Sequence, residues 1–121
     1  MKREETVQNY LEAIHIVSLE KKEVHAIDIA NYLSFSRPTV SIALRQLESE
    51  GFLVNNDNVI TLTETGKKIA ETMYERHVYI ARLLMKIGVD EKTAYEDSCL
   101  IEHDLSMETF NAIKEATKDY L

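Results

Sequence analysis

The side chains best suited to chemistry stand together in one short stretch, Cys99-Leu100-Ile101-Glu102-His103. In a helix, a thiol, a carboxylate and an imidazole at i, i+3 and i+4 would project from one face. These side chains bind divalent transition metals, and three on one face make up most of a coordination shell. An ordinary buried thiol at Cys99, with Glu102 and His103 on a solvated edge, fits the same stretch. Ligands from other segments would decide between the two interpretations.

Two upstream segments offer such ligands. Asn9 and Glu12 stand three residues apart in a helix predicted over residues 4–20, so they share a face. Taken alone, Glu12 is more typical of a solvent-facing carboxylate. A long helix is predicted over residues 63–86, with Thr63 as its cap. His77 falls on the apolar stripe of this helix, where a lone histidine is more often a hydrogen-bonded core residue than a ligand.

The composition predicts one small, mostly helical protein of the reducing cytoplasm. The chain has 121 residues, 45% of them hydrophobic, and only three glycines and one proline interrupt the helix formers. A single cysteine excludes an internal disulfide. No stretch resembles a signal peptide or an apolar span long enough to cross a membrane, so we expect no membrane partner.

The net charge of −7 argues against nucleic-acid binding by bulk positive charge. The acidity is uneven, because residues 1–70 hold 8 Lys/Arg and 10 Asp/Glu whereas residues 71–121 hold 6 and 11. A DNA-binding half would therefore be the first one, using local basic points. The acidic second half fits cation binding and, equally, a solubilising surface.

Residues 24–62 predict a winged helix-turn-helix. Two short helices flank the turn Ser34-Phe35-Ser36, with Ser36 as the cap of the second helix and Gly51 at its C-terminal end. The β-type runs 52–54 and 59–62 then surround the turn-forming cluster 55–58, which predicts a hairpin wing. A structural helical domain with a hairpin is the alternative.

The second of these helices would present a row of exposed side chains near its N-terminal end. Small hydroxyls and arginines there suit phosphate and major-groove contacts. Lys67, early in the long helix, would lie close to the wing and reach phosphates. The exposed positions are Arg37, Thr39, Ser41, Ile42 and Arg45.

The last third of the chain predicts two more helices, capped by Asp90 and Ser106. The first would carry the Cys99 stretch, and both offer more apolar surface than a winged helix needs. A homodimer interface is the natural use, because palindromic operators require two-fold symmetric proteins. The predicted fold is therefore mainly α with a small β-hairpin, namely a winged helix-turn-helix (1–70) followed by a helical metal-binding and dimerisation domain (71–121).

The chain resembles the diphtheria toxin repressor family, whose members are metal-activated bacterial repressors of metal uptake and whose branches include the manganese transport regulators. The resemblance runs along nearly the whole chain and rests on the element order and on several motifs. These are Asn9-Tyr10-Leu11-Glu12, Asp28-Ile29-Ala30, Pro38-Thr39-Val40-Ser41, Leu47-Glu48-Ser49-Glu50-Gly51, Leu62-Thr63-Glu64-Thr65-Gly66, Ile87-Gly88-Val89-Asp90 and Cys99-x-x-Glu102-His103, with His77 upstream.

The resemblance implies a set of ligands for a divalent metal: Glu12, His77, Cys99, Glu102 and His103, with Asn9 at a sixth ligand position where an amide would coordinate only weakly. Cys99 matches the iron branch of the family, whereas Glu12 matches the manganese branch. Because thiolate ligation favours softer metals, we expect Fe(II), with Mn(II) as the alternative and Zn, Co or Ni able to bind in vitro. The positions of a second, ancillary site hold Ala81 and Tyr95, so that site is expected to be absent, and a two-metal cluster through Glu12 and Glu102 stays open.

The resemblance also implies a mechanism and DNA contacts. Metal would overcome the mutual repulsion of the acidic ligands and tie the first helix to the dimerisation helices. It would thereby fix two recognition helices about 34 Å apart for a palindromic double-stranded DNA operator. Ser36, Arg37, Pro38 and Thr39 match the family's contact region. Ile42 replaces a polar residue there and could touch a thymine methyl but not hydrogen-bond a base edge.

Two other functions compete with this hypothesis. A winged-helix regulator that senses no metal, with Cys99 as a redox switch, would bind DNA regardless of chelators. A metalloenzyme would need a general base and a pocket for a small organic substrate, and neither is evident in the sequence. We therefore expect no enzymatic activity.

Overall fold

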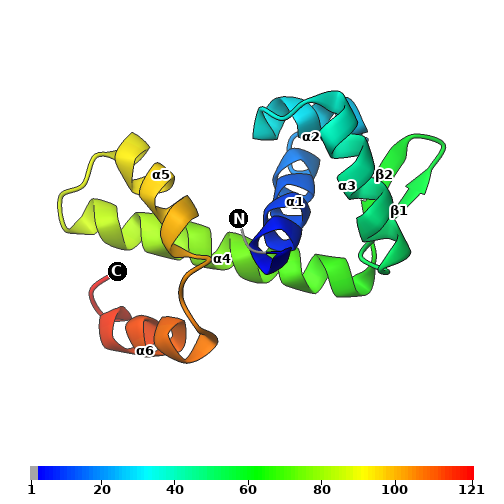
Figure 1. Cartoon of the computed structure of the whole chain (residues 1–121). Coiled ribbons are helices and arrows are strands. Elements are labelled where there is room, and N and C mark those ends of the chain that lie inside the picture. The colour runs from blue at the N-terminus through cyan, green and yellow to red at the C-terminus, as the bar shows by residue number, and fades with distance from the viewer. Residues whose placement is uncertain (1–2) are drawn as a thin grey trace. The chain divides into compact units, whose positions relative to one another are not determined.

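The computed structural model describes residues 3–121, which form two compact units. The first unit ends at Thr72, and the second covers Met73–Leu121. Figure 1 shows the elements, which are α1 (Arg3–Ser18), α2 (Ala26–Leu33), α3 (Arg37–Ser49), β1 (Leu53–Asn56), β2 (Val59–Leu62), α4 (Glu64–Lys86), α5 (Glu91–Ile101) and α6 (Met107–Thr117). The mainly helical fold with one two-stranded antiparallel hairpin, expected for a winged helix followed by a helical domain, is confirmed.

The first unit packs α1, α2, α3 and the hairpin around one apolar core. The largest buried side chains come from all three helices and from the first strand of the hairpin: Leu11 and Ile14 of α1, Ile29 of α2, Leu47 of α3 and Leu53 of β1. Leu11 and Ile14 are three residues apart, as on the buried face of an amphipathic helix, whereas Leu53 is the one buried residue of β1. This core fixes α3 relative to the wing.

Local hydrogen bonds set the start of α2. The backbone N–H of His25 donates to Asp28 Oδ2 (2.9 Å), and Lys21 Nζ donates to Asp28 Oδ1 (2.7 Å). These two contacts, that with Lys21 first, lower the pKa of the Asp28 carboxyl below its usual value. The helix ends at Ser34, whose left-handed conformation (φ 59°) turns the chain toward α3.

The wing is tighter than the sequence predicted. Asn55 and Asn56 belong to β1, so the turn comprises Asp57 and Asn58 alone, both with positive φ (56° and 70°). A two-residue turn with two positive φ values follows the twist of the paired strands, and Asp and Asn tolerate that conformation. The antiparallel register runs from Leu53↔Leu62 to Asn56↔Val59.

The predicted helix caps are confirmed. Ser36 Oγ accepts from Thr39 N, Thr63 Oγ1 from Gly66 N, Asp90 from Lys92 N and Thr93 N, and Ser106 Oγ from Thr109 N. Each side-chain oxygen satisfies an N–H group that the helix itself cannot pair. The starts of α3, α4, α5 and α6 are therefore determined by residues close by in the sequence.

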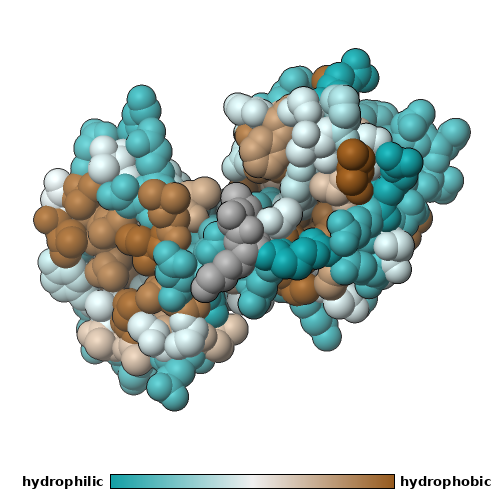
Figure 2. Space-filling view, in the orientation of Figure 1, coloured by the Kyte–Doolittle hydropathy of each residue, from teal (hydrophilic) through white to brown (hydrophobic). Residues whose placement is uncertain are grey.

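In the second unit, α5 and α6 pack on the C-terminal part of α4. The Tyr79 ring meets Phe110 edge-on with centroids 5.8 Å apart, and Lys114 of α6 donates to Glu75 of α4 (2.5 Å). Apolar side chains also gather on the face of this unit seen in Figure 2. The large exposed apolar residues of the unit are Ile87, Leu100, Ile101, Met107 and Tyr120.

Among residues 3–121, no helix has the length and apolar character needed to span a membrane.

Candidate metal centre and nucleic-acid interface

Three of the predicted ligands converge in the second unit. A ligand atom from each of His77, Cys99 and Glu102 lies within 4.8 Å of the other two. His77 comes from the middle of α4, Cys99 from the last turn of α5, and Glu102 is the C-cap of α5. Two helices therefore supply an imidazole nitrogen, a sulfur and a carboxylate oxygen to one place.

The prediction that one helix carries Cys99, Glu102 and His103 on a single face is wrong. The helix α5 ends at Ile101, and Asp104 N donates to Ile101 O (3.0 Å) in the turn that follows. His103 therefore leaves the helix, and its Nε2 lies 3.4 Å from Glu102 Oε1. No glycine or proline marks this end, so nothing in the local sequence signals it.

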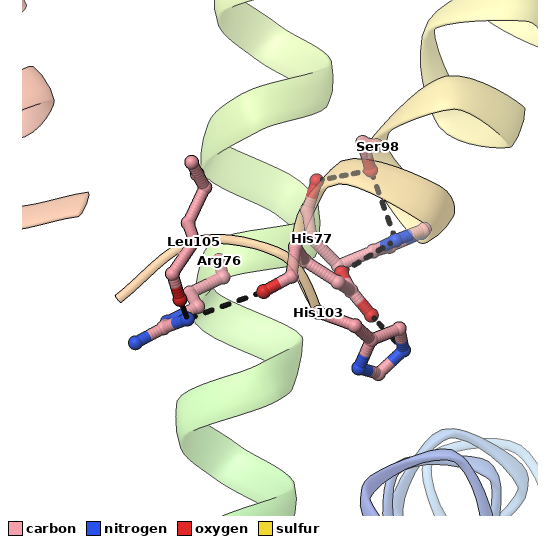
Figure 3. A network of polar contacts seen from close by, with 6 residues as sticks. Arg76, His77, Ser98, His103 and Leu105 are labelled. Atoms are coloured by element: carbon pink, nitrogen blue, oxygen red, sulfur yellow. Dashed lines mark hydrogen bonds and ion pairs between the residues drawn. The ribbon is translucent and has the colours of Figure 1, made fainter. Parts of the chain in front are cut away.

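His77 is held by residues of α5 and by the C-cap of that helix (Figure 3). Its Nδ1 lies 3.2 Å from Glu102 Oε2. The buried Ser98 hydroxyl donates to the His77 carbonyl oxygen (2.8 Å) and lies 3.0 Å from Nδ1. The Tyr95 ring adds a tilted contact at 5.4 Å between centroids. These contacts restrict the imidazole to one orientation, as histidine ligands require.

The donor set fits a divalent transition metal. Two donors on one ion at about 2.0–2.3 Å can be at most about 4.6 Å apart, so small side-chain rotations would bring all three into range. Cys99 is exposed, which makes the buried-thiol interpretation wrong. Glu102 is 0% exposed, and a carboxylate so deeply buried is costly unless positive charge or hydrogen bonds offset it.

Glu12 and Asn9 belong to the first unit, on α1, where their spacing gives them a common side of the helix. Glu12 is buried and Asn9 half-buried, so the solvent-facing interpretation of Glu12 is wrong. Their assignment as ligands stays a prediction.

Sequence reasoning missed Arg76 and Ser98, which contact Glu102 and His77 without belonging to the predicted ligand set. Arg76 is buried and donates to main-chain carbonyls of the α5–α6 connection (Figure 3). Its position three residues after Met73 and four before Ile80 places it on the buried stripe of α4. That spacing could have indicated from the sequence that this arginine is buried. Ser98 follows the buried Ala94 by four residues and carries the same signal on α5.

The predicted DNA contacts are all exposed on the first unit. They comprise Ser36 and the α3 residues Arg37, Pro38, Thr39, Ser41, Ile42 and Arg45, with Lys67 in the second turn of α4. Ile42 is 61% exposed although it is a large apolar residue. The wing is tied to α3, because Asn55 N donates to Glu48 Oε2 (2.9 Å). The arrangement offers a helix N-terminus, hydroxyls and cations on one rigid element, which suits a DNA groove.

Two family models match the chain. Residues 3–58 match the N-terminal DNA-binding domain of iron-dependent repressors, and residues 63–120 match their metal-binding and dimerisation domain. Together these domains indicate a homodimer that binds operator DNA.

Curated relatives agree. The chain is 33% identical to the transcriptional regulator MntR of Salmonella typhimurium over 119 residues, which cover 98% of this chain and 76% of the relative. It is 31% identical to the HTH-type transcriptional regulator MntR of Lysinibacillus sphaericus over 109 residues, 89% and 78% of the two chains.

Solved structures share the fold. A manganese-dependent transcriptional repressor in complex with manganese superposes with a TM-score of 0.84 at 23% identity, covering 91% of this chain and 51% of that one. The IdeR of T. acidophilum superposes with a TM-score of 0.79, also at 23% identity, covering 92% and 53%. The chain thus spans about half the length of these solved chains. On the family models and the curated relatives, the chain belongs to the DtxR/MntR family of metal-dependent transcriptional repressors.

Proposed function

We propose that this repressor is activated by Fe(II) held by His77, Cys99 and Glu102, and that the activated homodimer represses genes of metal uptake. The observation that supports the proposal is the meeting of these three donors in one unit. Thiolate ligation favours Fe(II), Co(II) or Zn(II) over Mn(II), because Mn(II) prefers oxygen donors.

The physical basis is the charge of the donors. The Glu102 carboxylate and Cys99, once it is deprotonated to the thiolate that metal binding requires, bring two negative charges beside His77, and like charges so close repel. His77, Cys99 and Glu102 would hold the cation, whose charge would offset this repulsion and whose bonds to the three side chains would link the end of α5 to α4. Because the ligands must be brought together, the binding energy stabilises that arrangement of the dimerisation domain.

On the DNA side, we place the exposed N-terminal part of α3 in the major groove. Arg37 and Arg45 supply cations. In the first turn of the helix the Arg37 N–H can also face a phosphate, whereas Pro38 has no N–H and Thr39 N is bonded to Ser36 Oγ. In a homodimer the two α3 helices must be about 34 Å apart to enter successive major grooves. Metal binding in the dimerisation domain is the proposed means of fixing that spacing. As a regulator that binds DNA and metal, the protein is proposed to act in the cytoplasm and to catalyse no reaction.

Mn(II) is the second candidate activator. It is favoured by solved structures of the same fold that are described as a manganese-dependent repressor and a manganese regulator, SloR. Glu12, His103 and Asn9 are the further predicted ligands, and their oxygen and nitrogen donors would suit Mn(II) as well as Fe(II). Whether the Cys99 thiolate is needed for activation therefore distinguishes Fe(II) from Mn(II) as the activating metal.

The deciding experiment is operator binding by chelator-treated protein, titrated anaerobically with Fe(II) and separately with Mn(II), for the wild type and Cys99→Ala. The operator is first selected from random-sequence duplexes in the presence of metal. We expect Fe(II) to activate binding and Cys99→Ala to weaken that activation by at least about tenfold, the usual cost of a perturbed metal site.

Glu102→Gln, which removes one buried anionic donor, should lose activation by either metal. Glu96→Gln is its matched control, because Glu96 is an exposed carboxylate of the same helix outside the ligand group. Activation by Mn(II) that survives in Cys99→Ala would move the protein to the manganese branch. Binding unaffected by both metals would contradict the metal centre itself.

A further inference from the structure

Arg76 is a buried arginine with an unusual set of acceptors. Arg76 lies on α4, and the residue is only 6% exposed. Nη1 donates to the main-chain oxygens of Glu102 (3.1 Å) and Leu105 (2.7 Å), and Nη2 lies 3.5 Å from Met107 Sδ. None of these acceptors is a carboxylate. The guanidinium also lies over the Phe110 ring, 5.2 Å from its centroid.

These contacts join three consecutive pieces of the second unit. Glu102 is the C-cap of α5, Leu105 lies in the connection, and Met107 begins α6. The last carbonyls of a helix lack partners within it, and a cation beside them is favoured by the helix dipole. One guanidinium therefore fixes the path of the chain where it leaves α5, including the turn that carries His103 (Figure 3).

The same stretch of α4 also holds the side chain of Glu102. His77, the next residue after Arg76, contacts Glu102 Oε2 at 3.2 Å, while Arg76 binds the Glu102 carbonyl oxygen. Two adjacent residues of one helix therefore fix the main chain and the carboxylate of the same glutamate. Because Glu102 is held both at its main chain and at its side chain, its carboxylate can adopt few orientations.

We propose that Arg76 is a positioning residue of the metal centre: by bridging the carbonyl oxygens of Glu102 and Leu105, it presents the Glu102 carboxylate to His77 and Cys99. This inference rests on the proposed metal site. Arginine suits the task because its planar fork can reach two carbonyls at once and it stays charged when buried. Lysine offers a single nitrogen on a flexible stem, so it would replace the bridge only in part.

The test is Co(II) binding to the full chain, with Arg76→Met and Arg76→Gln compared with the wild type. The sulfur-to-Co(II) charge-transfer absorption reports the bond to Cys99, and the visible d–d bands report the ligand geometry. Far-UV circular dichroism and thermal unfolding without metal report folding. We expect folded Arg76→Met and Arg76→Gln to bind Co(II) about 10–100-fold more weakly with altered d–d bands, as losses of supporting hydrogen bonds at metal sites do.

Arg76→Lys should fall between the wild type and Arg76→Met in affinity. Arg82→Met is the matched control, since Arg82 is an exposed arginine of the same helix, and it should match the wild type in both readings. Wild-type affinity and d–d bands in folded Arg76→Met or Arg76→Gln would overturn the proposal. The Arg76 variants could also bind Co(II) more weakly only because part of the protein is unfolded. If the unfolded fraction accounts for the whole loss of affinity and the d–d bands are unchanged, the role of Arg76 is purely structural and the proposal is overturned.

The result separates this inference from the proposed function. A wild type that shows no charge-transfer absorption with Co(II) would contradict the metal centre and the role of Arg76 together. A wild type that shows the absorption, together with folded Arg76 variants that have its Co(II) affinity and its d–d bands, would contradict the role of Arg76 alone.

Discussion

Glu102 shows how much of the site depends on single side chains. Its carboxylate is fully buried beside His77, and its carbonyl oxygen accepts from Arg76. Burying a charge in this way is costly, and proteins tolerate the cost where the charge is needed for binding. This cost is consistent with the proposed role of Glu102 as a metal ligand.

Ile42 is a large apolar residue of α3 that lies on the surface and not in the core. A 61% exposed isoleucine adds little to the core, so we expect Ile42→Ala to change the free energy of unfolding by less than about 0.5 kcal/mol. On DNA, an apolar side chain in the major groove can contact only the methyl group of thymine. Burying one such methyl contributes up to about 0.8 kcal/mol, roughly a fourfold gain in affinity.

The measurement is binding to a selected operator in which individual thymines are replaced by deoxyuridine, which lacks the methyl group. The wild type should lose up to about fourfold in affinity at one position, and Ile42→Ala should not respond to that replacement. An equal loss for both proteins would contradict a contact between Ile42 and thymine.

At the scale of elements, Gly66 decides how closely α4 approaches the wing. A Cβ atom at this position would lie 2.0 Å from the carbonyl oxygen of Phe52, which is main chain and cannot rotate away. That same oxygen accepts from Thr63 N (3.1 Å), so displacing it would also disturb the start of α4. The glycine is required by a close approach and not by its φ angle.

We therefore expect Gly66→Ala to lower the free energy of unfolding by about 1–3 kcal/mol, the usual cost of overpacking. Urea denaturation of the metal-free chain measures this directly. Thr65→Ala is the control, because Thr65 is exposed in the same turn and should change stability by less than about 0.5 kcal/mol. Equal stability of Gly66→Ala and the wild type would show that the helix can move away from Phe52 at no cost.

At the scale of the whole molecule, metal binding and DNA binding belong to different domains of the family and must be coupled. Coupling between two binding sites is reciprocal, so operator DNA must raise metal affinity by the same factor by which metal raises operator affinity. We expect this factor to be about 5–150, equivalent to 1–3 kcal/mol. Because the net charge of the chain is −7, a bound cation also reduces its repulsion from DNA, and this effect contributes to the coupling factor.

The measurement is a metal titration of the chain with and without saturating operator DNA, and an operator titration with and without metal. A scrambled duplex of equal length is the control and should leave metal affinity nearly unchanged at moderate salt. Unequal factors from the two titrations would show that a further equilibrium, such as dimerisation, takes part.

The sequence by itself determined the elements of this protein, because their signals are local. Ser36, Thr63, Asp90 and Ser106 cap the helices that they were predicted to cap, since a capping oxygen needs only the N–H groups two or three residues ahead. The apolar periodicity likewise predicted the helices and the exposed face of α3. The family followed from the same residues in order along the chain.

Only the tertiary structure decided how the site is built. Neither the end of α5 at Ile101 nor the burial of Glu102 has a local signal, because both depend on Arg76 and His77, some 25 residues away. The contact of Ser98 with His77 and the approach of Gly66 to Phe52 are non-local in the same way. Side-chain spacing names the candidates for such contacts, but the packing of one element on another determines which of them meet.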